Sequence, residues 1–592
     1  RAALSTDTKG SKSTAIGQGA LNTQNFATAT DTFNTAVGFF AGLAITTGVQ
    51  NTFLGPLAGT SLTDADFNVA LGMSSLEADT LGSKSTALGF QTLKNQNFTT
   101  ATDSFNVAVG HQAGLSISTG VQNTLIGALA GDALTDADFN VAVGVTALGG
   151  DTLGSKSTAI GYSALVNQNF TTATDTFNTA VGYEAGQAVT TGVNNTFVGG
   201  QTGEANTTGS QNTFVGARAG DAINTGGNNV SVGWASLTTD TKGDKTVAVG
   251  RSALSSQNFT TATDTYNVAV GYSAGLSVTT GTVNTLVGGL AGDALTSGNS
   301  NVAVGYGSLT TDTLGDRNVA IGVVALETQN FTTTTDSYNV AVGYAAGSSV
   351  TTGTLNTFVG ALAGDAFTDA QHNVAIGYQA LTSDTQGDRS VAVGSNALNS
   401  QNGVNGNVYN TAMGYGAGQN VTSGQQNTIV GGLAGDALTD ADFNVAIGVS
   451  ALGADTLGSQ SVAIGNSALG TQNFTTATDS LNTAVGFQAG AAVTTGQSNV
   501  LIGGLAGDAL TDADSNVAIG KSALFTQNFT TATNGYNVAV GYNAGSLITT
   551  GFQNTFIGGE SGETLTTGKY NIGVGYRALA RDTLGSKSVA VG

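Results

Sequence analysis

The five residues Asn106-Val107-Ala108-Val109-Gly110 form a pattern that returns along the whole of this 592-residue sequence. The pattern reappears as Asn34-Thr35-Ala36-Val37-Gly38 and as Asn301-Val302-Ala303-Val304-Gly305, and 33 copies can be counted. We call this pattern the core word. Because self-similarity at a short fixed period is the signature of repeat architectures, the core word predicts a solenoid.

The glycines that close the core words give the length of the repeat. Their spacing is 21, 17, 17 and 17 residues, which makes a period of 72. One block has an additional 17-residue unit and another lacks one, so the physical unit is one coil of 17 residues. The sequence predicts one continuous array over 1–592, with super-repeats 1–17 (partial), 18–89, 90–161, 162–250, 251–322, 323–394, 395–465, 466–520 and 521–592. If each coil advances by about 4.8 Å, this array is a rod of roughly 150 Å.

The core word itself is typical of a strand, because branched apolar residues alternate with alanine. The closing glycine, as at Gly38, Gly110 and Gly305, indicates a tight turn, since glycine takes positive φ without steric cost. A segment of small residues follows, as in 127–131, and then polar turn-forming residues. Each coil is therefore predicted to contain two short strands and two turns, and the fold class is an all-β parallel β-roll or β-solenoid.

Asparagine stands four positions before the glycine in 26 of the 33 copies, including Asn34, Asn106 and Asn301. Identical residues on successive coils lie above one another, so their amides are predicted to hydrogen-bond along the stack as a ladder. A row of ligand-binding amides is the alternative interpretation.

The four coils of a block differ systematically. The second coil has a large apolar residue, such as Leu125, where the others have alanine, and such alternation lets layers interdigitate. The fourth coil replaces the asparagine by Ser or Thr and is preceded by an acid and usually a base, such as Asp79 and Lys84.

The first coil of each block contains a longer, threonine-rich loop with two aromatic residues. Paired aromatics either anchor a loop to its scaffold or form a stacking surface for a sugar. The loops return about every four coils, roughly 19 Å apart, and repeated weak contacts gain strength by effective concentration. We expect any recognition by this segment to be multivalent and to use these loops. The candidate contact residues are Phe98, Thr99, Thr100, Phe105, Phe259 and Tyr266.

The composition excludes several classes of function. The formal net charge of -21 argues against nucleic-acid binding, which needs a basic surface. No apolar run approaches the roughly 20 residues of a membrane helix, so this segment is not expected to insert into a membrane. The count of Cys 0 leaves no disulfide or thiolate chemistry. Both ends match the same part of the repeat and neither is an atypical capping coil, so we expect a segment of a longer protein.

Catalytic and metal-binding residues are scarce. His111 and His372 lie on different coils, so we expect exposed turn residues, no catalytic triad and no cofactor. The recurring acidic word with Asp132, Asp136 and Asp138 could bind Ca²⁺ through oxygen ligands, but it matches no known calcium loop. A solvated turn with side-chain-to-backbone hydrogen bonds is the favoured interpretation, and no metal site is predicted.

The stretch Ser461-Val462-Ala463-Ile464-Gly465-Asn466-Ser467-Ala468 resembles the head repeat of trimeric autotransporter adhesins of the YadA type. Similar repeats occur in phage tail fibres. The resemblance covers the whole chain and implies a left-handed parallel β-roll, three chains side by side, and binding to host matrix or surface molecules. The longer coils and the regular 21-residue coil differ from that family's pattern.

The sequence therefore predicts a non-enzymatic extracellular fibre at a cell surface or on a virion. Val107 and Val109 lie on one face of the strand and Ala108 on the other, and a thin coil cannot bury both. A side-by-side homotrimer, with possible end-to-end filament growth, is the expected self-association; the other expected partners are host or neighbouring-cell surface molecules. A purely structural filament or tail-fibre shaft is the alternative function, and a glycan-degrading solenoid enzyme ranks last because the acids are not clustered.

Overall fold

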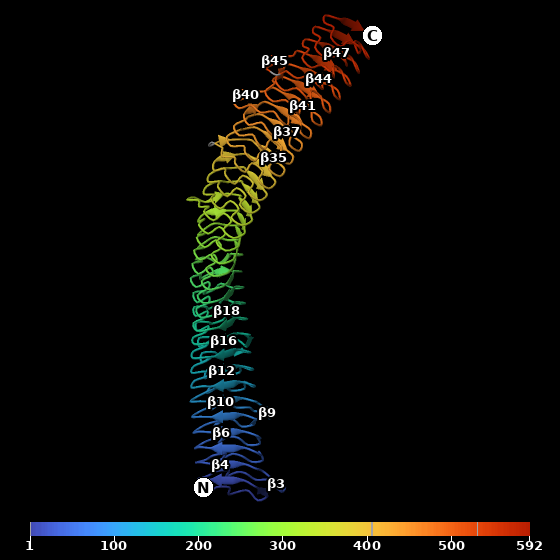
Figure 1. The fold of residues 1–592 in the computed structure, drawn as a ribbon. Coiled ribbons are helices and arrows are strands. Elements are labelled where there is room, and N and C mark those ends of the chain that lie inside the picture. Colours follow the sequence, from blue (N-terminus) through green and yellow to red (C-terminus); the bar gives the residue numbers. More distant parts are fainter. Residues whose placement is uncertain (1, 404–405, 530) are drawn as a thin grey trace. The chain divides into compact units, whose positions relative to one another are not determined.

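A computed structural model describes residues 2–403, 406–529 and 531–592 (Figure 1). Arg1 of the partial first super-repeat and two loop positions of super-repeat 395–465 lie outside the described residues. The described residues form strands and turns and no helix. The chain divides into two compact units, Arg1–Gly298 (unit 1) and Asn299–Gly592 (unit 2). The boundary falls inside super-repeat 251–322.

Every core word forms one strand of three residues, which gives 33 such strands in the described chain. Unit 1 contains β2 (Thr14–Ile16), β4 (Thr35–Val37), β5 (Thr52–Leu54), β6 (Val69–Leu71), β8 (Thr86–Leu88), β10 (Val107–Val109), β11 (Thr124–Ile126), β12 (Val141–Val143), β14 (Thr158–Ile160), β16 (Thr179–Val181), β17 (Thr196–Val198), β18 (Thr213–Val215), β19 (Val230–Val232), β21 (Val247–Val249), β23 (Val268–Val270) and β24 (Thr285–Val287). Unit 2 contains β25 (Val302–Val304), β27 (Val319–Ile321), β29 (Val340–Val342), β30 (Thr357–Val359), β31 (Val374–Ile376), β33 (Val391–Val393), β35 (Thr411–Met413), β36 (Thr428–Val430), β37 (Val445–Ile447), β39 (Val462–Ile464), β41 (Thr483–Val485), β42 (Val500–Ile502), β44 (Val517–Ile519), β46 (Val538–Val540), β47 (Thr555–Ile557), β48 (Ile572–Val574) and β49 (Val589–Val591).

Within each unit these strands pair in parallel with the strands of the neighbouring coils. The register keeps equivalent residues together, so that Val107 pairs with Thr124 and Ala108 with Leu125 between β10 and β11. The same register continues from β11 to β12, where Leu125 pairs with Ala142. The prediction of a parallel β-solenoid with coils of about 17 residues is confirmed.

The prediction of two strands in every coil is wrong. Among the described residues, a second strand, of two residues, forms only where the last coil of one block meets the first coil of the next: β1 (Gly10–Ser11) with β3 (Thr30–Asp31), β7 (Gly82–Ser83) with β9 (Thr102–Asp103), β13 (Gly154–Ser155) with β15 (Thr174–Asp175), β20 (Gly243–Asp244) with β22 (Thr263–Asp264), β26 (Gly315–Asp316) with β28 (Thr335–Asp336), β32 (Gly387–Asp388) with β34 (Gly406–Asn407), β38 (Gly458–Ser459) with β40 (Thr478–Asp479), and β43 (Ala513–Asp514) with β45 (Thr533–Asn534).

The small-residue segment after the glycine forms turns because of its backbone conformation, which neighbouring coils hold in place. Leu129 and Gly131 have φ values of 58° and 56°, so two left-handed residues alternate with ordinary ones and the chain cannot extend. Hydrogen bonds to both neighbouring coils hold this conformation: Leu129 donates its N–H to His111 O at 2.9 Å, and Gly131 donates to Ala147 O at 2.9 Å.

The middle residue of each strand points into the coil and forms the core. It is alanine in most coils. In the second coil of a block it is Phe53 or an equivalent large residue, which is completely buried and fills the interior. Phe53 fits because glycine stands beside it in two coils: a Cβ on Gly42 would meet the ring at 2.7 Å, and one on Gly59 at 2.5 Å. The large residue of the second coil is therefore matched by a missing side chain, which supports the predicted interdigitation of large and small layers.

Candidate interaction surfaces

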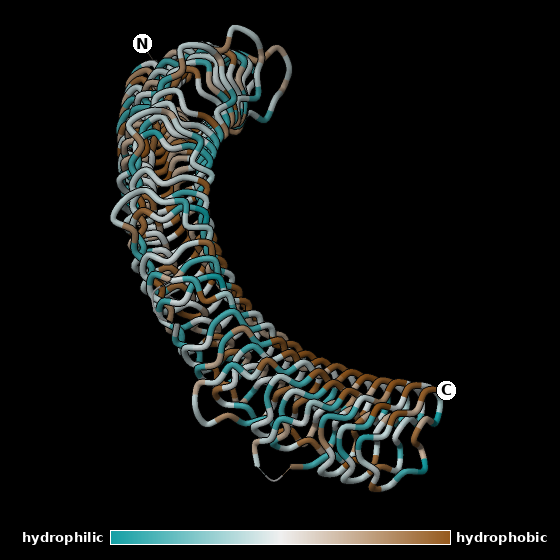
Figure 2. Tube along the Cα trace, turned by 90° about the horizontal axis from the view of Figure 1, so that it is seen from above, coloured by the Kyte–Doolittle hydropathy of each residue, from teal (hydrophilic) through white to brown (hydrophobic). Residues whose placement is uncertain are grey.

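One continuous apolar surface runs along the strands of each unit. The first and third residues of each strand point away from the core, and the residues five before and one after the closing glycine flank them. We call these four positions together the outer face. Of the 51 exposed large hydrophobic side chains in the described chain, 48 lie at these four positions. Figure 2 shows hydrophobic residues following one another from coil to coil.

The position after the glycine contributes much of the aromatic surface. Tyr162 and Tyr183 of consecutive coils stack with their ring centroids 5.4 Å apart. The Arg251 guanidinium lies between two rings, 5.0 Å from the Trp234 centroid and 5.8 Å from that of Tyr272. Exposed apolar patches of this extent mark interaction sites in soluble proteins. The outer face is thus the largest candidate binding surface within each unit.

The asparagine column lies beside the core and is completely buried. Asn106 donates from Nδ2 to Gly120 O at 2.7 Å, and its Oδ1 accepts the Asn123 N–H at 2.9 Å. Asn34 and Asn301 make the same bonds, to Gly48 O at 2.7 Å and to Gly315 O at 2.8 Å. Each amide therefore provides hydrogen-bond partners for backbone groups of the next coil. Direct amide-to-amide contacts also occur, for example from Asn123 Nδ2 to Asn106 Oδ1 at 3.3 Å.

The turn glycines adopt the predicted backbone. Gly38, Gly110 and Gly305 have φ values of 144°, 141° and 136°. The next coil also approaches closely, because a Cβ on Gly110 would lie 2.6 Å from the carbonyl carbon of Gly127. Glycine is required here both by the conformation and by the spacing between coils.

A pair of an aspartate and a glutamine, which sequence reasoning missed, supports the long loops of all blocks except 521–592, where Leu510 stands in place of the aspartate. Asp79 accepts Gln96 Nε2 at 2.5 Å, and its other oxygen accepts the N–H groups of Gly82 at 3.0 Å and Phe98 at 3.2 Å. Gln96 Oε1 in turn accepts Asn106 Nδ2 at 2.9 Å. The same Asp–Gln pairing occurs at Asp7, Asp151, Asp240, Asp312, Asp384 and Asp455. The constant 17-residue spacing of the two side chains was the signal that could have revealed it.

Burial raises the pKa of the Asp79, Asp312 and Asp384 carboxyls, while the glutamine and backbone hydrogen bonds oppose this rise. A raised folded-state pKa means that the folded chain binds the proton more readily than the unfolded chain. Stability then falls as the pH rises from the unfolded value towards the folded one. We therefore expect a higher urea midpoint near the ordinary aspartate pKa, at about pH 4, than at about pH 7.

The measurement needs about 0.5 M salt, because screening removes most of the repulsion among the exposed acids and leaves the buried groups largely unscreened. A urea midpoint that falls on acidification under these conditions would contradict the account of the buried aspartates.

The two aromatics of the long loop have different environments. Phe98 and Phe259 are buried and anchor the loop, whereas Phe105 is 49% and Tyr266 53% exposed. Thr99 and Thr100 are exposed at the loop tip. The first ring thus anchors the loop to its scaffold and the second lies at the surface, because the chain turns inward at the first ring and outward at the second.

A cation covers the outward ring. Lys245 Nζ lies 5.1 Å from the Tyr266 centroid and 2.6 Å from Asp264 Oδ2. Hydrogen bonds to Asp264 and Tyr266 raise the pKa of Lys245 to about 12. Lys84 lies equally close to Phe105, at 5.1 Å from its centroid. Each of these exposed rings is thus part of a small cluster with one cation and one acid.

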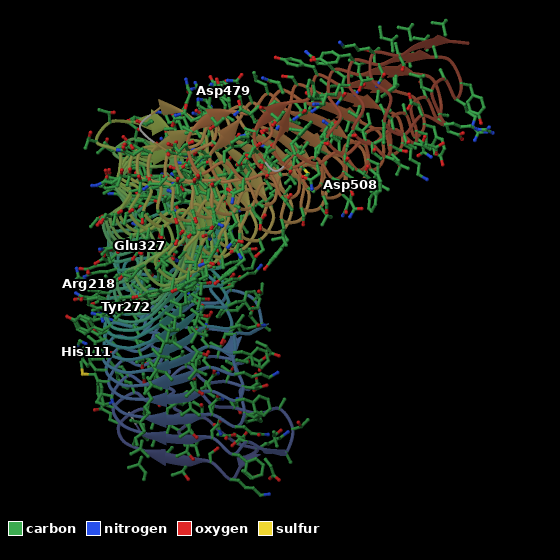
Figure 3. All side chains as sticks on the ribbon, turned by 45° about the horizontal axis from the view of Figure 1, so that its top comes forward. His111, Arg218, Tyr272, Glu327, Asp479 and Asp508 are labelled. Carbon is green, nitrogen blue, oxygen red and sulfur yellow. The ribbon has the colours of Figure 1, made fainter. Side chains whose placement is uncertain are left out.

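The two histidines lie at positions of the outer face, and the acidic word lies on a turn. His111 and His372 are exposed, and in Figure 3 His111 and Arg218 lie along the same edge of unit 1. In the acidic word, Asp136 Oδ1 accepts Thr119 Oγ1 at 2.6 Å and Asp138 Oδ1 accepts the Val121 N–H at 2.7 Å. These bonds join neighbouring coils. Burial raises the pKa of Asp132.

Residues 2–403, 406–529 and 531–592 contain no group of three His, Cys, Asp or Glu side chains arranged to hold a metal ion. They also contain no helix with the length and apolar character needed to cross a membrane. Comparison of the sequence with models of protein families and with curated proteins found no match.

Proposed function

We propose that this chain is a non-enzymatic segment of an extracellular fibre whose copies associate side by side through the outer face. The observation that carries the proposal is the size of that face. It is seven residues, or about 20 Å, wide and advances about 4.8 Å per coil, which gives ~95 Å² per coil. The 16 coils of unit 1 then offer roughly 1,500 Å² per copy, about twice what a stable interface needs from each partner.

A second copy of the same chain fits this face best. The face repeats from coil to coil, and a parallel copy repeats at the same interval. The chain is acidic overall, but no aspartate or glutamate stands at the four positions of the outer face, so this face is where copies can approach without strong repulsion. By the resemblance to trimeric adhesin heads we propose a parallel homotrimer of left-handed rolls.

The first test of this proposal places charges on the face. Val109→Lys, Ile126→Lys and Val143→Lys together put three lysines at adjacent outer positions of β10, β11 and β12. Burying them between copies would cost several kcal/mol. We expect light scattering to give about 176 kDa, three times the 58.5 kDa of one chain, for the wild type, and one chain for the variant.

The matched control places lysines at Thr99, Thr100 and Ala101, which are exposed on the loop tip outside the outer face. It should keep the wild-type mass. A wild type that has the mass of one chain, or a face variant that still associates, would contradict the proposed association.

The threonine-rich loops supply the adhesin-like part of the proposal. They are anchored mainly by the Asp–Gln pairs and the buried phenylalanines, and in unit 1 they recur every four or five coils, roughly 19 or 24 Å apart. A row of anchored contacts at this spacing suits multivalent attachment to a cell or host surface. The alternative function is a structural filament or tail-fibre shaft that carries a recognition domain elsewhere.

Shortening each 21-residue coil to the 17-residue form separates these two functions. The coils without the loop fold in the same chain, so the shortened protein should still associate. We expect its binding to the target surface to fall by at least tenfold, because many weak contacts are lost together. Unchanged adhesion by a correctly assembled variant would favour the structural filament.

A further inference from the structure

We propose that the additional coil 200–216 fixes the register in which copies of this chain associate. The inference rests on the proposed side-by-side association and names a device within that interface. Its basis is the order in which polar and apolar side chains follow one another along the outer face. Each coil supplies one level of that face, and the order of polar and apolar levels is regular except at two places.

Cations mark one level of the outer face in each block that ends within unit 1. They stand five residues before the closing glycine and lie over an aromatic ring of the following coil: Lys12 over Phe33, Lys84 over Phe105, Lys156 over Phe177 and Lys245 over Tyr266. Each cation also pairs with an aspartate of that following coil. The intervening levels of the same column carry no cation and include exposed rings such as Phe67 and Phe139.

A strictly periodic face would not specify one register. A copy displaced by four coils, roughly 19 Å, would again meet polar levels with polar levels and apolar levels with apolar ones. The difference in free energy between such registers would come only from the unpaired coils at the ends. Sheets with repetitive faces are prone to this kind of slippage.

The additional coil removes this degeneracy in unit 1. The steps from Lys12 to Lys84 and from Lys84 to Lys156 are four coils each, but the step from Lys156 to Lys245 is five. A copy displaced by four coils would therefore place Lys156 level with Asn228, and Lys245 level with Phe177. In the slipped register the two lysines would lose water without meeting a level of the other copy that a cation marks, and this cost disfavours that register. In unit 2, block 466–520 lacks one coil, and its last coil has Ser515 in place of a cation.

The additional coil is not explained by core stability. Its Asn206 occupies the interior position that Val189 and Ile223 occupy in the coils on either side. The side chain is 0% exposed, and neither its Nδ2 nor its Oδ1 has a hydrogen-bond partner. An unpaired buried amide is unfavourable. The coil thus weakens the core where it stands while it changes the spacing of the outer levels.

The test restores a regular array in the full chain. The regular variant lacks 200–216 and contains a second copy of 432–448 after Gly503, so every complete block has four coils. The control variant lacks 128–144 in place of 200–216, has the same length, and stays irregular. Since the chain has Cys 0, Thr99→Cys provides a single spin-label site for measuring distances between copies by electron resonance.

We expect one distance between copies for the wild type and the control, and an additional longer distance, from displacement by about 19 Å, for the regular variant. A regular variant that keeps the single distance, or a wild type with several registers, overturns the inference and leaves the association intact. A wild type with the mass of one chain overturns the association and the inference with it.

A second variant keeps the number of coils unchanged in case the regular variant does not fold. Lys84→Met, Lys156→Met and Lys245→Met make the marked levels apolar, so slipped registers should appear here as well. If this variant associates in one register only, the cations do not mark the levels.

Discussion

Gly305→Val is expected to open the solenoid at one place and leave the rest folded. Gly305 has φ 136°, and a Cβ there would lie 2.6 Å from the carbonyl carbon of Gly322 and 3.1 Å from the Val323 nitrogen. The left-handed conformation and the contact with backbone should together cost about 3 kcal/mol or more. Because each coil contacts only its neighbours, hydrogen exchange should increase around β25 and β27 and stay unchanged several coils away.

Gly432→Ala is the matched control for this variant. Gly432 follows a core-word glycine in the same unit, its φ lies outside the left-handed region, and a Cβ there would have no heavy atom within 4 Å. Its effect should be within about 0.5 kcal/mol. Loss of protection throughout the chain after Gly305→Val would show that the coils do not fold as a one-dimensional stack.

Asn106→Leu is expected to have the other large effect, although leucine has a similar size and is more apolar. It removes the bonds to Gly120 O, to the Asn123 N–H and to Gln96 Oε1. All three groups would remain buried without a partner, at about 1–3 kcal/mol each, so the local cost is roughly 3–9 kcal/mol. Increased exchange in the coils of β10 and β11 is the measurement.

Asn318→Ser serves as its control. Asn318 belongs to a fourth coil, where other blocks have serine, and Ser85 shows that serine fits, since its Oγ accepts Gln96 Nε2 at 2.9 Å. We expect a change of about 1 kcal/mol or less. Equal effects of the two substitutions would mean that the hydrogen bonds of the asparagine column do not stabilise the backbone of the next coil.

The strand and its closing turn were predictable because both depend on residues within one coil. Alternation at Val107, Ala108 and Val109 fixes which side chain points inward, and Gly110 fixes where the strand ends. The second strand was not predictable by the same reasoning. Leu129 lies in the left-handed region, and the hydrogen bonds of Leu129 to His111 of the previous coil and of Gly131 to Ala147 of the next coil hold this segment as a turn.

The long loops also combine features that the sequence of one coil predicts with features that depend on a neighbouring coil. Phe98 and Phe105 look equivalent in the sequence, but Phe98 follows the buried Gln96 and donates its N–H to Asp79, so its ring turns inward. The role of Asp79 depends on a residue 17 positions away in the next coil. A polar residue that recurs at one interior position of a solenoid therefore needs to be compared with the same position in the next coil.

Electron cryo-microscopy of the purified chain tests the central claim most directly, because a cross-section reveals which surface of each copy meets another. The account predicts three copies in each cross-section, with Val109, Ile126 and the equivalent outer residues directed at the neighbouring copies. A particle of one chain, or an assembly in which the outer face points to solvent, would contradict it.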